Sequence, residues 1–255
     1  VGFVIQENPS SGGDIANDVA VDGTGFYVVG YDSVLGISNT QWRIEKRNLT
    51  TGAVIWSKTS NPSVGSDVAL GVAVDGAAVY VVGLDNTLGG LDNQWRIEKR
   101  DKTIGDLVAS FGIGGIVQIN LSDGNDTPYD VAVDSTGIYA VGSKQPILGS
   151  LDWHIKKLNL ATGALIWTGP TWEGYSSGVA LDSSGVYAVG GHKLAAFVDY
   201  EWGMRKLALA GGSIIWSATE NPSSNQDWPN KVTVDGSAFY ISGADQPISG
   251  EQRWR

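Results

Sequence analysis

Aromatic side chains in polar segments are the first candidates for chemistry in this sequence of 255 residues. Two of its tryptophans and several tyrosines lie in stretches rich in Gly, Ser, Asn and Asp, near a glutamate and a histidine. Aromatic rings presented with carboxylates and amides can stack on a sugar or a peptide. The same rings could instead cover the ends of a sheet, and the sequence leaves both interpretations open. The candidate ligand-binding residues of this kind are Trp172, Trp228, Tyr175, Tyr129, Glu173 and His192.

Three aspartates form a second candidate set, because each follows an aromatic segment that ends in glycine. These aspartates are Asp32, Asp85 and Asp245. If the segments are neighbouring strands around an axis, the carboxylates surround the mouth of a central channel and could hold a ligand or a cation. Polar groups at such positions also cap the end of a strand and face water, which is the alternative interpretation.

Motifs for catalysis and metal binding are weak in this chain. GYSSG 174–178 fits the G-x-S-x-G pattern, but that chemistry needs a strand-to-helix turn and no helix follows here. DGNDTPYD 123–130 brings oxygen ligands close together, without the glycine and terminal glutamate of an EF-hand. Two histidines and no cysteine do not favour zinc. We therefore predict no catalytic residue, no metal site and no cofactor, and leave a calcium ion in loop 123–130 as an open alternative.

The composition limits the classes of partner. The net charge is −10 and the pI is near 4.5, so nucleic acid and anionic membranes would repel the protein. No apolar run approaches the ~20 residues that a membrane span needs, so membrane insertion is not predicted. Charged residues make up only 17% of the chain and there are 35 glycines, which is typical of short strands joined by turns.

A repeat of four short β-like segments must position the candidate residues. The first segment is VAVD 19–22, VAVD 72–75, VAVD 131–134, VALD 179–182 and VTVD 232–235. The second is FYVVG 26–30, VYVVG 79–83, IYAVG 138–142, VYAVG 186–190 and FYISG 239–243. The third is QWRIEKR 41–47, QWRIEKR 94–100, DWHIKKL 152–158, EWGMRKL 201–207 and the shorter QRWR 252–255. The fourth is AVIW 53–56, IVQI 116–119, ALIW 164–167 and SIIW 213–216.

Four antiparallel strands in about 50 residues form one blade of a propeller. The sequence therefore predicts an all-β, five-bladed β-propeller with four antiparallel strands per blade. The fifth blade lacks its fourth segment, and VGFVIQ 1–6 resembles that segment, so we expect the N-terminal strand to complete the last blade and close the ring. The whole chain, 1–255, is predicted to be a single domain. Its repeats span approximately 15–66, 67–126, 127–174, 175–227, and 228–255 completed by 1–14.

Residues that recur in every repeat are interpreted as scaffold. In QWRIEKR 41–47, alternation places Trp, Ile and Lys on one side of the strand and Arg, Glu and Arg on the other, so both sides should contact neighbouring blades. The aspartate that ends each VAVD-like segment should bond its own turn, and the tyrosine of each second segment should be buried with its hydroxyl bonded.

Loop lengths indicate where function lies. The loops between second and third segments, and between one repeat and the next, are long, whereas the other turns are short. In an antiparallel blade all the long loops emerge at the same end. Binding residues are usually carried by loops on a rigid scaffold, so we expect the function there.

Several stretches of the sequence resemble known repeat families. GVALDSSGVYAVGG 178–191 and ATGALIW 161–167 are similar to the bacterial and archaeal β-propeller repeat called SBBP. That resemblance implies a secreted or cell-surface protein, often part of something larger. TGAVIW 51–56 and TGALIW 162–167 resemble the tryptophan-docking motif of quinoprotein (PQQ) propellers, and LVASFGIGGIVQI 107–119 resembles delta-60 repeats. The quinone and calcium ligands of quinoproteins find no match here, so the resemblance implies no cofactor.

These observations predict a non-catalytic extracellular or cell-surface module that binds a glycan or a protein on its long-loop face. One alternative is a structural subunit of a surface layer or filament, self-associating or built into a larger polypeptide. Another is a glycoside hydrolase, which needs unique carboxylates that converge. Glu173, Asp126 and Asp130 are the acids we would nominate for that chemistry.

Overall fold

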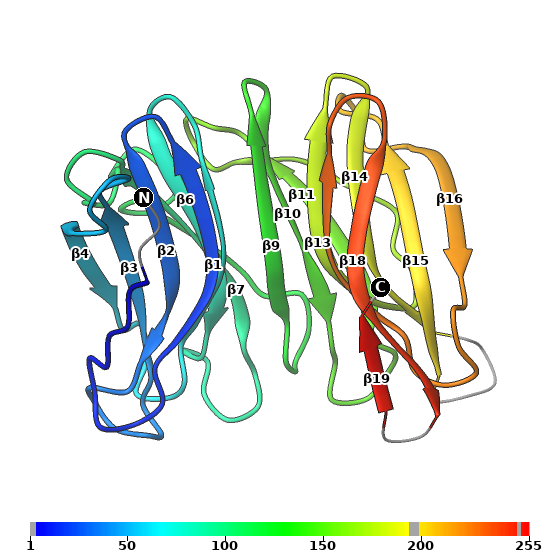
Figure 1. Cartoon of the computed structure of the whole chain (residues 1–255), viewed down its shortest axis with the longest axis horizontal. Helices are drawn as coiled ribbons and strands as arrows, with labels where there is room; N and C mark the ends of the chain where they lie inside the picture. The colour runs from blue at the N-terminus through cyan, green and yellow to red at the C-terminus, as the bar shows by residue number, and fades with distance from the viewer. Residues whose placement is uncertain (1–3, 194–198, 249–250, 255) are drawn as a thin grey trace. The chain divides into compact units, whose positions relative to one another are not determined.

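The computed structural model describes residues 4–193, 199–248 and 251–254, which form 19 strands and no helix (Figure 1). The chain divides into two compact units. The first comprises residues 1–128 and 160–163, and the second comprises residues 129–159 and 164–255. Nothing in the part of the chain that the structure describes is a helix long and apolar enough to cross a membrane.

The first unit contains two antiparallel sheets, each of which runs in simple chain order from one strand to the next. The first sheet consists of β1 (Ile15–Asp22), β2 (Gly25–Asp32), β3 (Gln41–Arg47) and β4 (Val54–Ser60). The second sheet consists of β5 (Val68–Val74), β6 (Ala78–Asp85), β7 (Gln94–Asp101) and β8 (Ile116–Ile119). The two QWRIEKR segments are therefore the third strands of both sheets, as the repeat predicts.

The second unit contains three antiparallel sheets of the same kind. The third sheet consists of β9 (Thr127–Asp134), β10 (Gly137–Lys144), β11 (Asp152–Leu158) and β12 (Leu165–Thr168). The fourth sheet consists of β13 (Gly174–Asp182), β14 (Gly185–Lys193), β15 (Tyr200–Leu207) and β16 (Ile214–Glu220). The fifth sheet consists of β17 (Trp228–Val234), β18 (Phe239–Ile248) and β19 (Glu251–Trp254).

The predicted fold class is confirmed: the chain is all-β and its sheets are five antiparallel blades of the β-propeller type. The fifth sheet differs from the others because it has three strands among the described residues. Part of the segment expected to supply its fourth strand, residues 1–3, lies outside the described residues. The described part, residues 4–6, does not form a strand, so strand closure stays a prediction.

Tryptophan side chains bury the interface between neighbouring sheets within a unit. Trp42 and Trp56 of the first sheet pack with Val72 and Val81 of the second in one apolar cluster. The Trp42 indole is fully buried and its Nε1 donates to the carbonyl of Leu84, 2.9 Å away. The predicted packing of the Trp-Ile-Lys side of QWRIEKR against the next blade is thereby confirmed for this strand.

Lysines of the third strands tie one sheet to the next in the same way. Lys46 Nζ lies 5.3 Å from the centre of the Tyr27 ring and donates to the carbonyl of Lys102 at 3.0 Å. In the second unit, Lys157 Nζ donates to the carbonyl of Leu209 at 3.0 Å. A cation over an aromatic face, shielded from water, adds to the hydrogen bond that crosses the interface.

Each short turn between first and second strands is held by its aspartate. Asp134 Oδ1 accepts from the backbone of Thr136 at 2.7 Å and of Gly137 at 3.0 Å, and its other oxygen accepts from the Tyr139 hydroxyl at 3.2 Å. The same aspartate–tyrosine bond is present in the other four sheets, between 2.9 and 3.4 Å. The roles expected for the turn aspartates and the tyrosine hydroxyls are therefore confirmed.

The pKa values of these turn aspartates indicate how the stability of the fold should depend on pH. Burial acts to raise the pKa of Asp22, but hydrogen bonds from Thr24 and the nearby Lys102 ammonium lower it from the ordinary 3.8 to about 2. A lowered pKa in the folded state means stability that is present above about pH 4 and is lost as the pH falls toward 2. We expect the melting temperature, followed by circular dichroism, to fall across that range.

Asp22→Asn tests this assignment. The variant should melt lower than the native protein at neutral pH and lose less between pH 4 and 2, because the ion pair with Lys102 no longer titrates. Part of the acid loss should remain, since the pKa values of Asp182 and Asp235 are also lowered by their turn hydrogen bonds. Equal acid dependence in both proteins would contradict the role given to Asp22.

Candidate functional site

The fourth sheet, its flanking loops and the neighbouring strand β9 bring together five of the sequence-predicted binding residues at the long-loop end. Trp172 and Glu173 lie in the loop before β13, Tyr175 lies on β13 and His192 lies near the end of β14. Tyr129, on β9, approaches Tyr175, with 6.3 Å between the ring centres. The chain brings these residues together because the long connections and the strand ends that they join share one end of the sheet.

The Trp172 ring is enclosed by three side chains of the protein itself. The Arg205 guanidinium carbon lies 4.0 Å from the ring centre, and the His192 imidazole lies 4.2 Å from it, tilted by 36°. Trp153 packs at 5.2 Å. Arg205 is only 7% exposed, and this burial lowers its pKa to about 10. A ring with such neighbours contributes to packing, and little of its surface is left for stacking on a ligand.

Three tyrosines, which come from β9, β13 and β15, form a row. Tyr175 stands between Tyr129 and Tyr200, with ring planes inclined by 60° and 63°, an edge-to-face arrangement that aromatic rings prefer. Burial raises the pKa of the Tyr175 hydroxyl. Tyr200 was missed in the sequence because it directly precedes a repeated strand, where the pattern indicates scaffold.

A histidine–glutamate pair closes the cluster. His192 Nδ1 and Glu201 Oε1 are 2.9 Å apart, and the two residues are direct cross-strand partners on β14 and β15. The equivalent pairs are Asp32 with Gln41, Asp85 with Gln94 and Lys144 with Asp152. The sequence contained this signal: residues that differ in type between repeats remain polar and complementary across the same two strands.

The remaining candidates lie on other sheets. Asp32 is buried and accepts from the Gln41 amide at 2.9 Å and from the backbone of Val34 at 3.2 Å. Asp85 is also buried, and it accepts from Thr87 and from the Gln118 amide at 2.7 Å. Both carboxylates therefore cap strand ends. Asp245 is buried on β18, and Trp228 is half-buried at the start of β17.

The acids nominated for calcium binding or glycoside hydrolysis each accept hydrogen bonds from protein groups. Asp126 accepts from the backbone of Ser122 and from its hydroxyl, both at 2.7 Å. Asp130 accepts from the backbone of Val179 at 2.9 Å and from Lys231 at 2.8 Å. Glu173 pairs with Lys193 at 3.1 Å. A calcium ion in loop 123–130 would have to displace such bonds.

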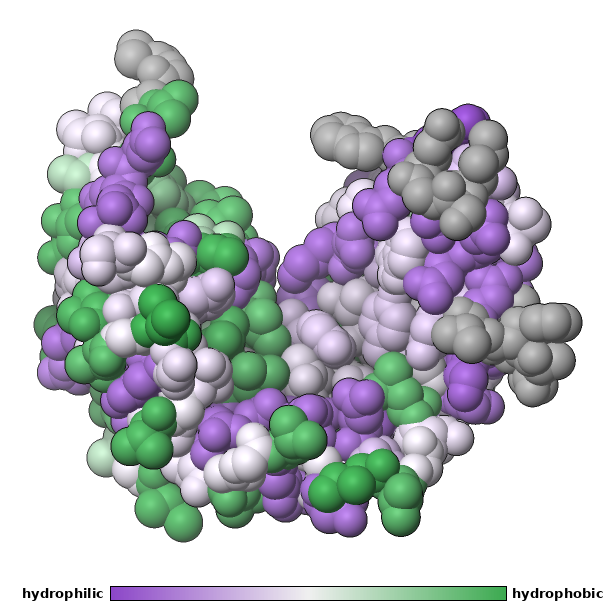
Figure 2. Space-filling model, turned by 90° about the horizontal axis from the view of Figure 1, so that it is seen from below, coloured by the Kyte–Doolittle hydropathy of each residue, from purple (hydrophilic) through white to green (hydrophobic). Residues whose placement is uncertain are grey.

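A second candidate surface is the apolar loop patch, which lies at the long-loop end of the first unit. Its side chains lie on the loops that follow β2, β4 and β6, and they are between 49% and 90% exposed. Figure 2 looks onto this end and shows hydrophobic residues, in green, on the surface of the first unit at the left. The apolar loop patch consists of Val34, Leu35, Ile37, Val64, Leu88 and Leu91.

Buried hydrogen bonds hold the three loops of the patch together. Asp67, fully buried, accepts from the backbone and the hydroxyl of Ser63 and from the backbone of Asn86 at 2.9 Å. Its own backbone N–H donates to the carbonyl of Thr40 at 3.0 Å. Burial raises the pKa of this carboxyl. The side chain and the backbone of this one residue thus join all three loops. Sequence reasoning missed the patch because it took repeated residues for scaffold.

Comparison with known proteins adds little to this geometry. No family model matches the chain, and no curated protein matches it. Among solved structures, the chain is similar to one described as a europium-containing methanol dehydrogenase, with a TM-score of 0.47 and 12% sequence identity. The match covers 91% of this chain and 48% of the other, so the chain spans about half of that protein. At this level the likeness carries no argument about function.

Proposed function

We propose that the protein is a non-catalytic binding module that docks a partner protein through the apolar loop patch. The carrying observation is that Ile37, Val64 and Leu91 are 83%, 90% and 71% exposed on loops that a buried aspartate fixes in place. Exposed apolar side chains that gather on one surface mark interaction sites. Because the loops are held by hydrogen bonds before binding, little ordering entropy is lost when a partner docks.

The chemistry of the patch favours a protein over a glycan. Its side chains are aliphatic, whereas sugars are held by aromatic faces combined with polar groups. The aromatic cluster of the fourth sheet has that composition, but Trp172 packs against Arg205 and His192. The nominated carboxylates accept bonds from protein groups, which supports a role without catalysis. The resemblance to SBBP repeats supports a place outside the cell or at its surface.

The proposal is tested by a triple substitution in the apolar loop patch, Ile37→Asp, Val64→Asp and Leu91→Asp. All three side chains are exposed, so the fold should tolerate the changes. Proteins retained from an extract of the source organism are compared with those retained by the native chain. We expect a specific protein whose retention falls by about tenfold or more in the variant, as for loss of central apolar contacts.

A matched control carries three aspartates at the opposite end of the same unit, at Leu49, Ile104 and Ile113, which are also exposed. This control should retain the partner like the native chain. If both triple variants retain the partner equally poorly, the added negative charge is the cause, and the apolar loop patch is rejected as the binding site. A glycan array is the second check. If the native chain and the loop variant bind the same glycan equally well, the protein partner is rejected in favour of a sugar.

A further inference from the structure

Asn48, at the short-turn end of the first unit, begins a triplet of the N-glycosylation type. Asn48, Leu49 and Thr50 read Asn-X-Thr, in which X is any residue except proline. In secreted proteins the side-chain nitrogen of such an asparagine is the acceptor for an N-linked glycan. The triplet lies in the turn between β3 and β4, and all three of its residues are exposed.

The turn holds Asn48 by one end of its side-chain amide and leaves the other end free. Its Oδ1 accepts from the backbone of Thr50 at 2.8 Å and of Thr51 at 2.9 Å. Its Nδ2, the atom that would carry a glycan, makes no hydrogen bond to the part of the chain that the structure describes, and neither does the Thr50 hydroxyl. A sugar on Nδ2 would therefore leave both bonds of Oδ1 in place.

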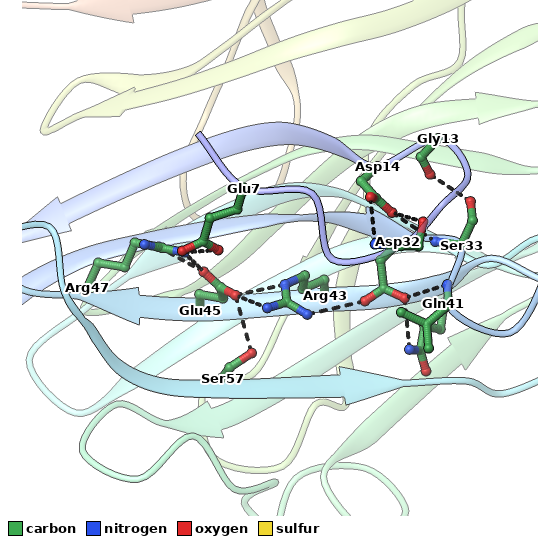
Figure 3. A network of polar contacts seen from close by, with 12 residues as sticks. Glu7, Gly13, Asp14, Asp32, Ser33, Gln41, Arg43, Glu45, Arg47 and Ser57 are labelled. Carbon is green, nitrogen blue, oxygen red and sulfur yellow. Dashed lines mark hydrogen bonds and ion pairs between the residues drawn. The ribbon is translucent and has the colours of Figure 1, made fainter. Parts of the chain in front are cut away.

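Arg47 fixes the base of this turn from within the first sheet. Its Nη1 donates to the carbonyl of Gly52 at 3.1 Å, and its guanidinium pairs with Glu7 at 2.5 Å (Figure 3). Gly52 has a φ of 70°, the left-handed conformation that closes the turn. The turn is thus held in one conformation by bonds that do not involve the Asn48 nitrogen.

The backbone of the turn requires neither of the two side chains of the triplet. In the fourth sheet, alanine stands at both places, as Ala208 and Ala210. The backbone N–H and the carbonyl of Ala208 still make the two bonds that close the turn, both at 2.9 Å, as those of Asn48 do. The Asn48 side chain adds bonds to its turn, but nothing described there uses the Thr50 hydroxyl. Turn formation therefore does not account for the pairing of Asn with Thr.

Three similar triplets in the chain are excluded by their middle residue. They are the Asn-Pro-Ser stretches 8–10, 61–63 and 221–223, and proline at this place prevents the modification. Ser63 shows what such a stretch does instead, because its hydroxyl donates to the buried carboxylate of Asp67 at 2.9 Å. These stretches belong to the framework of the long loops.

Two further triplets without proline, 120–122 and 125–127, begin in the loop after β8. Asn125 is half-buried, its Oδ1 accepts from the Asn93 amide at 2.8 Å, and the middle residue of its triplet, Asp126, is fully buried. Asn120 is exposed, but the hydroxyl of its triplet, on Ser122, donates to Asp126 at 2.7 Å. Of these triplets and that of Asn48, only the last is exposed along its whole length.

We propose that Asn48 carries an N-linked glycan. In the reaction, Asn48 Nδ2 attacks C1 of the first sugar of an oligosaccharide that is held on a phosphorylated lipid carrier. The bond between C1 and the phosphate oxygen breaks, the bond between Nδ2 and C1 forms, Nδ2 loses one proton, and the lipid phosphate leaves. The inference rests on the place outside the cell proposed above, and it is independent of the apolar loop patch.

The glycan stands at the end of the first unit opposite to the apolar loop patch. Asn48 directly follows the last residue of β3, whereas the loops of the patch follow β2, β4 and β6. Because these strands are antiparallel to β3 or occupy the equivalent place in the second sheet, their loops emerge at the other end. The modification therefore leaves the patch open to a partner.

The test maps the protein purified from its source organism by mass spectrometry. Trypsin cleaves after Arg47 and Lys58, so peptide 48–58 holds this triplet and no other. We expect this peptide to carry a sugar, and fragmentation of the peptide to place the sugar on Asn48. An unmodified peptide 48–58, or a sugar on one of its threonines, overturns the proposal.

Thr50→Ala and Thr51→Ala, produced in the same organism, form a matched pair within one turn. Thr50→Ala removes the hydroxyl of the triplet but keeps Asn48, and it should lose the sugar. Thr51→Ala leaves the triplet intact and should keep the sugar. Retention of the sugar in Thr50→Ala overturns the proposal, and so does its loss in both variants, which would assign recognition to the turn. Both variants should still retain the partner of the apolar loop patch, so the failure of one proposal is distinguishable from the failure of the other.

Discussion

Replacing Gly83 with alanine is expected to destabilise the first unit by about 3 kcal/mol or more. Gly83 lies on β6, opposite Ala69 and next to a β-bulge. A methyl group there would stand 2.1 Å from the carbonyl oxygen of Val68 and 2.8 Å from the Trp42 ring. The first neighbour is the backbone of the paired strand β5, and the second is a fully buried indole of the first sheet. Neither can move aside without disturbing the pairing of β5 with β6 or the contact between the sheets.

The matched control is Gly76→Ala, in the turn between β5 and β6 of the same sheet. A methyl group at Gly76 would meet nothing within 4 Å, and the residue does not have a positive φ. Its replacement should change the free energy of unfolding by about 0.5 kcal/mol or less, or stabilise slightly through the unfolded chain. Urea unfolding followed by tryptophan fluorescence measures both. If both substitutions lower the free energy of unfolding by a similar amount, the tight contact at Gly83 is refuted.

The scaffold could be predicted because its signals are local and repeated. Alternation within QWRIEKR places Trp42 and Arg43 on opposite sides of one strand whatever surrounds it. The turn aspartates bond residues two or three positions ahead, so their role follows from a few neighbouring residues. Five copies of each signal made the number of blades predictable, although the fourth strand of the last one depends on residues distant in sequence.

The candidate site was less predictable because its contacts join segments that carry no shared signal. The rule that unrepeated residues in long loops bind ligands selected Trp172, but the side chain that covers it, Arg205, belongs to a repeated strand. Asp67 ends a loop that resembles three others, and its bonds to Ser63 and Asn86 appear only when the loops are folded. The exposure of Ile37 and Val64 likewise depends on which side chains the folded loops leave uncovered.

The Arg-Glu-Arg side of the second QWRIEKR segment forms a buried ladder of charges. Glu98 is fully buried and accepts from Arg96 at 2.8 Å, from Arg100 at 2.7 Å and from the hydroxyl of Ser60. Arg96 also reaches Asp85 at 3.3 Å. Both guanidiniums are less than a tenth exposed, so water cannot replace the carboxylate if it is removed. The Ser60 contact makes this ladder part of the interface with the first sheet.

Glu98→Gln should therefore lower the free energy of unfolding by about 3 kcal/mol, because it keeps the shape of the side chain but leaves two buried cations without their shared anion. Asp106→Asn is the control: it removes an ion pair with Lys58 whose carboxylate is 60% exposed, and should cost about 0.5 kcal/mol or less. Raising the salt concentration should shrink the small effect at Asp106 and leave the large one, since buried charges are screened little. A loss at Glu98 as small as that at Asp106 would mean that water enters the ladder, and the two sheets would then be joined mainly through Trp42 and its apolar neighbours.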